Sequence, residues 1–170
     1  MLQTGDTSPH RRIRRGGFTL IELATVMTIM GVVAAMAVPR YGSFIAQERL
    51  EAAARRISAD LTLAQREART AGVQQQITFS NVTHKYTVGT VKNMDHPGEA
   101  YVVSLADEPY GGKIVAVNFG GNADVIFDGY GAPDTGGSVT IRVGTRQKTI
   151  DLDAGTGRPK IQKLVTLDVL

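Results

Sequence analysis

The sequence of 170 residues contains no cysteine and no tryptophan, and aromatic residues make up only 6% of it. Without cysteine there is no thiol nucleophile, no thiolate metal ligand and no disulfide bond, so the folded part must be held by its hydrophobic core alone. The sequence also lacks the G-x-S-x-G, phosphate-loop and H-E-x-x-H motifs that mark several enzyme classes. We therefore expect no enzymatic activity and no cofactor.

Histidine is scarce as well, since the chain has only His10, His84 and His96. His84 and the Asp95-His96 pair are the nearest approach to a metal-binding set. No second ligand follows at the i, i+4 spacing that places two ligands on one helix face. We therefore expect no metal site.

The basic character of the chain is confined to its first 17 residues. The formal net charge of the whole chain is +3, and four arginines against one aspartate give residues 1–17 the same net charge. The remainder contains 15 Lys/Arg and 15 Asp/Glu, so its side-chain charge is zero. The overall charge therefore says little about a partner of residues 18–170.

Residues 18–38 form an apolar run with Glu22 as its one charge. As a helix this run spans roughly 32 Å, close to the hydrocarbon thickness of a bilayer. The preceding arginines should stay in the cytoplasm by the positive-inside rule. The pattern predicts a single membrane-spanning helix, with everything after residue 38 exported. An ordinary secretory signal is the rival interpretation, but it would have a shorter apolar stretch without an acid.

Glu22 is the unusual residue of this run. A carboxylate in mid-membrane costs about 2.5–3.5 kcal/mol on insertion scales, and less near a helix end. Such a residue is by default a functional one. The alternative is a side chain close enough to the interface to reach water.

The nine residues RRGGFTLIE, which end at Glu22, resemble the prepilin peptidase site of type IV pilins and pseudopilins. The resemblance implies that residues 1–17 are a leader cleaved after Gly17, and that the new N-terminal Phe18 is N-methylated. It also implies that Glu22 pairs with the N-terminal amine of a neighbouring subunit during assembly. The expected partners are prepilin peptidase, other pilins and the inner membrane, before the protein enters a filament.

Residues 39–72 predict an amphipathic continuation of the helix. Apolar residues recur at steps of three and four: Leu50, Ala54, Ile57, Leu61, Ala64, Ala68 and Ala71. Gly72 supplies a helix stop. Charged residues occupy much of the rest, and we expect a solvated face from them: Arg49, Glu51, Arg55, Arg56, Asp60, Arg66 and Arg69.

Residues 73–170 alternate short strand-like runs with turn signals. The expected strands cover residues 73–79, 85–91, 100–105, 113–119, 124–127, 137–143, 146–152 and 160–169. Gly144 and Thr145 should close a tight hairpin. The predicted fold class is α+β: a long N-terminal helix, with a membrane half and an amphipathic half, packed on a small antiparallel β-sheet domain.

Residues 127–160 resemble the C-terminal region of GspH/FimT-type minor pseudopilins. The matching features are the run FDGYG that starts at Phe127, a glycine-rich turn, two strands and the Gly157-Arg158 turn. The resemblance implies a structural subunit assembled at or near the tip of a type IV pilus or a type II secretion pseudopilus. The tail of residues 161–170 extends beyond it.

A DNA-binding minor pilin for natural transformation is the alternative. Residues 95–134 hold seven acids and one base, a net charge of −6, whereas residues 139–170 hold six bases and three acids, a net charge of +3. Some FimT-like pilins bind DNA through a C-terminal Gly-Arg-x-Arg motif, which Gly157-Arg158-Pro159-Lys160 resembles. Arg158, Lys160 and Lys163 are the candidate phosphate contacts. An ordinary surface turn with solvated bases is the other interpretation, and no aromatic residues interleave these bases for stacking.

Overall fold

The computed structural model describes residues 17–92 and 100–167, with residues 36–41 and 90–92 described by their backbone alone. Most of the predicted leader, residues 1–16, lies outside the described residues, as do Asp95 and His96. The chain divides into two compact units, Met1–Arg40 and Tyr41–Leu170. One helix, α1 (Leu20–Ala71), contributes residues to both units, and each unit is described by itself.

In the second unit, α1 buries the face that the sequence periodicity predicts. Leu50, Ala54, Ile57, Leu61, Ala64 and Ala68 are at most 1% exposed. Ala53 joins them, whereas Ala71 is exposed because it lies in the last turn. Gly72 adopts a φ of 65°, the left-handed conformation of a helix C-terminus. The predicted helix stop is therefore confirmed.

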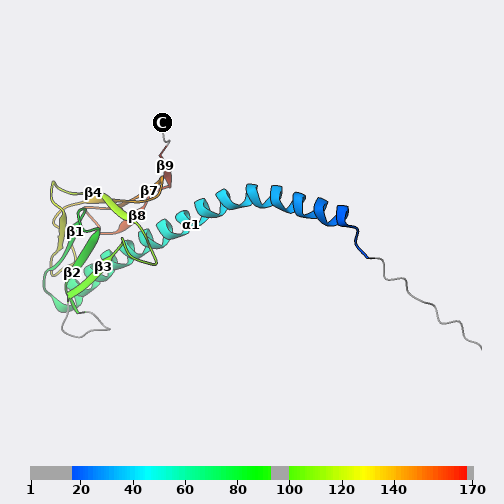
Figure 1. Cartoon of the computed structure of the whole chain (residues 1–170). Helices are drawn as coiled ribbons and strands as arrows, with labels where there is room; N and C mark the ends of the chain where they lie inside the picture. Colours follow the sequence, from blue (N-terminus) through cyan, green and yellow to red (C-terminus); the bar gives the residue numbers. More distant parts are fainter. Residues whose placement is uncertain (1–16, 93–99, 168–170) are drawn as a thin grey trace, which may run out of the picture. The chain divides into compact units, whose positions relative to one another are not determined.

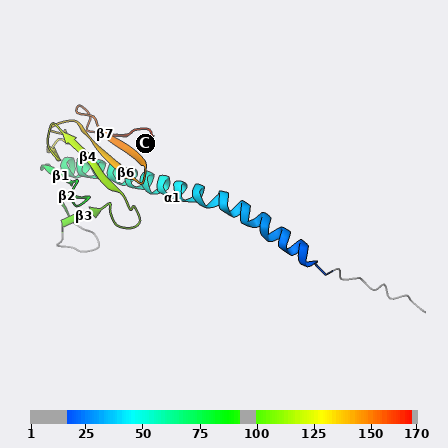
Figure 2. The ribbon, with the colours of Figure 1, turned by 45° about the horizontal axis from the view of Figure 1, so that its top comes forward.

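Among the described residues, nine strands follow the helix, in two antiparallel sheets. Figures 1 and 2 show the strands beside the second half of α1. The first sheet has the order β3-β2-β1-β5, and the second has the order β4-β6-β7-β8, with β9 also paired to β7. Their bounds are β1 (Gln75–Ser80), β2 (Lys85–Lys92), β3 (Ala100–Ser104), β4 (Lys113–Phe119), β5 (Asp124–Phe127), β6 (Gly137–Val143), β7 (Arg146–Leu152), β8 (Pro159–Ile161) and β9 (Val165–Thr166). The predicted α+β class and the antiparallel pairing are confirmed.

The hairpin between β6 and β7 also matches the prediction. Val143 pairs with Arg146, so Gly144 and Thr145 form a two-residue loop. Gly144 has a φ of 58°, as the first position of such a hairpin requires.

The predicted strand over residues 160–169 is wrong, because it divides into β8 and β9. Ile161 pairs with Ile150, but Val165 pairs with Gln147, so the chain between them carries one extra residue. An unbroken register would set Lys163 opposite Lys148, and like charges in that position repel each other. The interruption acts as a β-bulge that avoids this pairing.

One core joins α1 to both sheets. Leu50, Ile57 and Leu61 of the helix belong to the same buried cluster as Val88 of the first sheet and Ile150 of the second. The ring of Phe79 on β1 lies 5.8 Å from that of Phe119 on β4 and 5.4 Å from that of Tyr86 on β2. Because the core holds one face of α1 against both sheets, the opposite face of the helix is held in a fixed position relative to them.

Candidate functional site

The predicted processing site lies just before α1. Gly17 is exposed, and a Cβ added to it would meet no atom within 4 Å. The Phe18 side chain is 81% exposed. Nothing in the described fold therefore requires glycine at position 17, and the peptide bond after it is accessible.

Thr19 and Glu22 form the start of the helix. The Thr19 hydroxyl accepts a hydrogen bond of 3.2 Å from the Glu22 backbone N–H, and the Thr19 carbonyl accepts the first helical bond from Leu23 at 3.1 Å. Thr19 is thus the N-cap, and Glu22 holds the third helical position, where a capping box has its acid. The negative charge also suits the positive end of the helix dipole. The sequence analysis did not place Glu22 at the helix start, although the spacing Thr-x-x-Glu indicates such a position.

The first unit presents apolar side chains without a cover. Ten large hydrophobic residues between positions 18 and 33 are between 41% and 87% exposed: Phe18, Leu20, Ile21, Leu23, Val26, Met27, Ile29, Met30, Val32 and Val33. Thr25 and Thr28 also lie in this run. The hydroxyl of each donates a 2.8 Å hydrogen bond to the backbone carbonyl four residues earlier. Among the residues that the structure describes, no helix is both long and apolar enough to cross a membrane.

The predicted basic residues near the C-terminus lie on the surface. Arg158, Lys160 and Lys163 are all exposed. Lys160 on β8 lies opposite Asp151 of β7 in the register, so an acid lies beside the predicted phosphate contacts. Arg158 lines a pocket together with Arg66 and other residues of α1.

The turn that carries Arg158 is fixed by a buried glutamine. Gln65 of α1 is 6% exposed, and its amide donates hydrogen bonds of 2.9 Å to the Gly131 carbonyl and 2.8 Å to the Thr156 carbonyl. A Cβ at Gly157 would lie 2.4 Å from the Gln65 amide nitrogen, so glycine is required there. The hydroxyl and backbone N–H of Thr156 donate to the Asp153 carboxylate and hold the pKa of that exposed group below its ordinary value.

The charged face of α1 is not simply solvated, and the expectation is wrong for Asp60. Its side chain is buried at 4% exposure, and its carboxylate accepts a 2.5 Å hydrogen bond from the Tyr86 hydroxyl. The Arg56 Nε and the Tyr101 hydroxyl each donate to the same carboxylate at 3.1 Å. Burial, followed by the Asp60 charge, raises the pKa of both Tyr86 and Tyr101. Asp60 lies three residues after Ile57, which places it at the edge of the buried face.

Two ion pairs also connect α1 to other elements. Arg49 donates to Glu108 at 3.0 Å, and Glu51 pairs with Lys148 of β7, which is 9% exposed. Within residues 17–92 and 100–167, no group of three His, Cys, Asp or Glu side chains is arranged to hold a metal ion. The two ion pairs therefore connect the helix to the turn between β3 and β4 and to the second sheet.

Two family profiles match the sequence. One, described as type II transport protein GspH, covers residues 53–156, well over half of the chain. The other, described as the prokaryotic N-terminal methylation motif, covers residues 12–38 and therefore includes Gly17, Phe18 and Glu22. No curated protein matches the sequence significantly.

Two solved structures are similar to this chain at low sequence identity, and the first of them shares its fold. The minor pseudopilin EpsH from the type 2 secretion system of Vibrio cholerae is 15% identical with a TM-score of 0.51, over 67% of this chain and 96% of that one. The type IV minor pilin FimU of Pseudomonas aeruginosa PAO1 is 15% identical with a TM-score of 0.48, over 71% of this chain and 92% of that one.

Proposed function

Since this chain belongs to the GspH family of type II transport proteins, we propose that it is a minor pseudopilin or pilin assembled at or near the tip of its filament. The observation that carries the proposal is that both family profiles fall in one chain in the expected order. The methylation motif over residues 12–38 precedes the GspH region over residues 53–156. The filament is a type II secretion pseudopilus or a type IV pilus.

The family consists of structural subunits rather than enzymes. This agrees with the expectation from the sequence that the chain has no enzymatic activity. The proposed function is therefore assembly into a filament. It requires cleavage of the leader, anchoring in the membrane and docking onto a neighbouring subunit.

Processing is proposed to start at the accessible bond after Gly17. Prepilin peptidase removes residues 1–17, and Phe18 becomes the methylated N-terminus. Residues 18–38 then hold the subunit in the inner membrane, with residues 39–170 outside the cytoplasm. The support for this step is the contiguous exposed apolar surface of residues 18–33, which needs either lipid or neighbouring helices to cover it.

Glu22 is proposed to guide docking, in addition to its role in the helix start. A carboxylate among apolar side chains is tolerated when it is paired with a cation. The N-terminal amine of the neighbouring subunit supplies that charge. Pairing then favours insertion beside the last subunit of the growing filament over a free position in the bilayer.

Co-expression with a prepilin peptidase tests this proposal. The intact mass should fall by the mass of residues 1–17 and rise by one methyl group. A Gly17→Trp variant should keep its leader, while Gly16→Ala serves as a neighbouring control that should still be processed. Cleavage of the Gly17→Trp chain at the same bond would contradict the proposed site.

DNA binding is the second candidate function. Arg158, Lys160 and Lys163 are exposed, but Asp151 of β7 lies opposite Lys160 of β8. Titration of the full chain with duplex DNA, at low and physiological salt, tests it against the variant with all three bases changed to alanine. Salt-dependent binding that the variant loses would support a DNA-binding pilin. Equal weak binding by both proteins would exclude these residues as the DNA contacts.

A further inference from the structure

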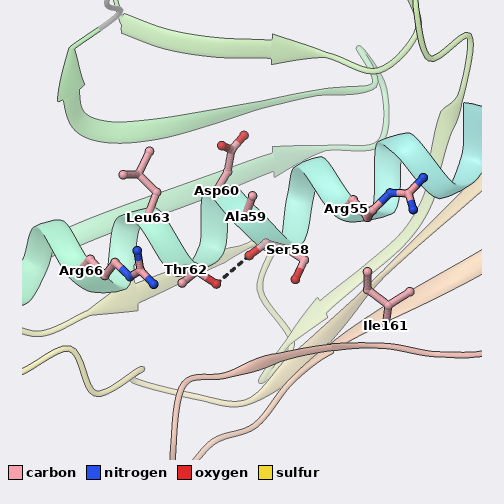
Figure 3. A pocket seen from close by; sticks show the side chains of 8 residues that line it. All are labelled: Arg55, Ser58, Ala59, Asp60, Thr62, Leu63, Arg66 and Ile161. Atoms are coloured by element: carbon pink, nitrogen blue, oxygen red, sulfur yellow. Dashed lines mark hydrogen bonds between the residues drawn. The ribbon is translucent and has the colours of Figure 1, made fainter.

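A groove runs along the side of α1 that faces β8 (Figure 3). Its first part has a volume of about 520 Å³, and the adjoining part has a volume of about 440 Å³. Ser58, Thr62 and Arg66 line both parts, so the two are continuous along the helix. We call this feature the basic groove.

The polar side of the basic groove is a single stripe of the helix. Its members follow one another at steps of three, four, four and three: Arg55, Ser58, Thr62, Arg66 and Arg69. Residues at such spacing share one helix face. The stripe is about 21 Å long at the helical rise, which matches about six residues of extended chain.

The positive charge of the groove is not neutralised within the described chain. Arg55, Arg66 and Arg158 make no described ion pair, since the described salt bridges belong to Arg49, Arg56 and Lys148. Arg69 donates only to a backbone carbonyl, that of Tyr130, at 2.9 Å.

One acid, Asp60, also lines the groove. Asp60 is 4% exposed, and its carboxylate already accepts hydrogen bonds from Arg56 and two tyrosines. Asp60 therefore leaves the groove arginines without a counter-charge, although residues 18–170 as a whole are neutral.

The other lining of the groove is apolar. Ala59 and Leu63 project from one flank of the helix, and Ile161 of β8 lies on the other flank (Figure 3). Pro159 of β8 lines the adjoining part. Apolar walls between arginines suit a chain that alternates carboxylates with apolar side chains. Phosphodiesters would gain nothing from them, and no aromatic residue lines either part for base stacking.

We propose that the basic groove binds an extended acidic segment of a neighbouring subunit. Arg66 and Arg158 hold carboxylates at one end through the paired N–H groups of their guanidinium forks, and Arg55 holds another at the opposite end. An apolar residue of the segment lies between them against Ile161. The inference rests on the proposed function only in that the partner is a filament subunit.

The test measures peptide binding to the full chain in neutral detergent micelles. The probe is a fluorescein-labelled peptide of about eight residues in which Glu alternates with Leu. A peptide with Gln in place of every Glu serves as its uncharged counterpart, and a duplex DNA of similar length represents nucleic acid. Fluorescence anisotropy gives the affinity of each probe.

Two variants that lose the same number of positive charges distinguish binding in the groove from attraction by the net charge of the protein. The first changes Arg55, Arg66 and Arg158 to Gln. The second changes Lys85, Lys113 and Arg142, which are exposed and line neither part of the groove, to Gln. A third variant, Ala59→Trp, fills the groove without changing its charge.

The Glu peptide should bind, the Gln peptide should not, and the first variant should weaken binding about tenfold. Ala59→Trp should weaken it as well, while the Lys85/Lys113/Arg142 variant should bind within about twofold of the unchanged chain. Absence of binding, equal loss in the two charge variants, or tighter binding of DNA than of the Glu peptide would each overturn the proposal. If binding fails while the chain is still processed and incorporated into filaments, the docking groove is wrong and the proposed function stands.

Discussion

The hydroxyl of Tyr86 on β2 donates a 2.5 Å hydrogen bond to the carboxylate of Asp60 on α1, and both side chains are buried. This contact connects the helix to the first sheet in the interior. Arg56 supplies the counter-charge to Asp60 from one helical turn away, at 3.1 Å. The relationship explains how an acid is accommodated beside the core of a domain that has no disulfide bond.

Removal of the Tyr86 hydroxyl should destabilise the domain. A hydrogen bond to a charged group contributes about 1.5–3 kcal/mol, so Tyr86→Phe should lower the free energy of unfolding by that amount. Urea unfolding of the compact unit of residues 41–170 measures the change. Tyr110→Phe is the matched control, because its hydroxyl makes no described hydrogen bond, and it should change the stability by less than about 0.5 kcal/mol. Equal effects of the two substitutions would show that the Asp60 contact contributes little.

The same hydroxyl predicts a loss of stability at alkaline pH. Burial, together with the Asp60 charge, raises the pKa of Tyr86 above its ordinary value of 10.0. Above about pH 10 the unfolded chain releases this proton while the folded chain keeps it, so the unfolded state is favoured. The contribution is fully present below about pH 10 and is lost as the pH rises.

Urea unfolding of residues 41–170 between about pH 9 and pH 11 measures this loss. Other tyrosines and lysines titrate in the same range, so the Tyr86→Phe variant is the reference. Its stability should fall less steeply with pH than that of the unchanged domain. Parallel curves would mean that Tyr86 does not titrate differently in the two states.

The turn that carries Arg158 gives a second prediction about stability. Gly157→Ala places a Cβ 2.4 Å from the Gln65 amide nitrogen and at a φ of 65°, so it should cost about 2 kcal/mol. Gly155→Ala in the same turn is the control, since its Cβ would meet nothing closer than 3.6 Å and its φ is not positive. Thermal or urea unfolding of both variants provides the comparison. A Gly155→Ala variant as unstable as Gly157→Ala would contradict the assigned contact.

The two roles of Glu22 are separable by substitution. Gln can replace Glu as the third residue of a capping box, so Glu22→Gln should preserve the helix start while it removes the charge. If the charge guides docking, Glu22→Gln should be cleaved normally but recovered from filaments in a much smaller amount. Thr19→Val removes the cap instead and should cost the helix about 1 kcal/mol.

Recovery of each variant in sheared filaments, relative to the membrane fraction, is the measurement. Incorporation of Glu22→Gln at the level of the unchanged protein would leave helix capping as the only supported role. Loss of incorporation in Thr19→Val but not in Glu22→Gln would also show that the helix start matters for assembly and the Glu22 charge does not.

The sequence predicted most elements of the second unit because each carries a local period. Leu50 to Ala68 repeat at helical spacing, and Val139 to Val143 alternate, so burial follows directly. The interruption between β8 and β9 was missed because it depends on what lies across the ladder, namely Lys148. Sequence alone cannot provide a cross-strand neighbour before the strand order is known.

The residues of the candidate site also differ in how well the sequence predicts them, because some depend on a local pattern and others on contacts between distant segments. Gly17, Phe18 and Glu22 lie within one run of nine residues, so their proposed roles could be predicted together. Asp60 was assigned to a solvated face because its partner Tyr86 lies on another element. Arg158 joins Arg66 only because the buried Gln65 holds the turn against α1, which is a tertiary relationship without a local signal.

The most direct test of the central proposal is the N-terminal mass of the protein recovered from filaments of the cell that produces it. Peptide mass spectrometry of sheared filaments should find a chain that begins with N-methylated Phe18, in far smaller amount than the main subunit. Recovery of a chain that still carries residues 1–17, or complete absence from filaments when the protein is abundant in the cell, would contradict the account of a processed minor subunit.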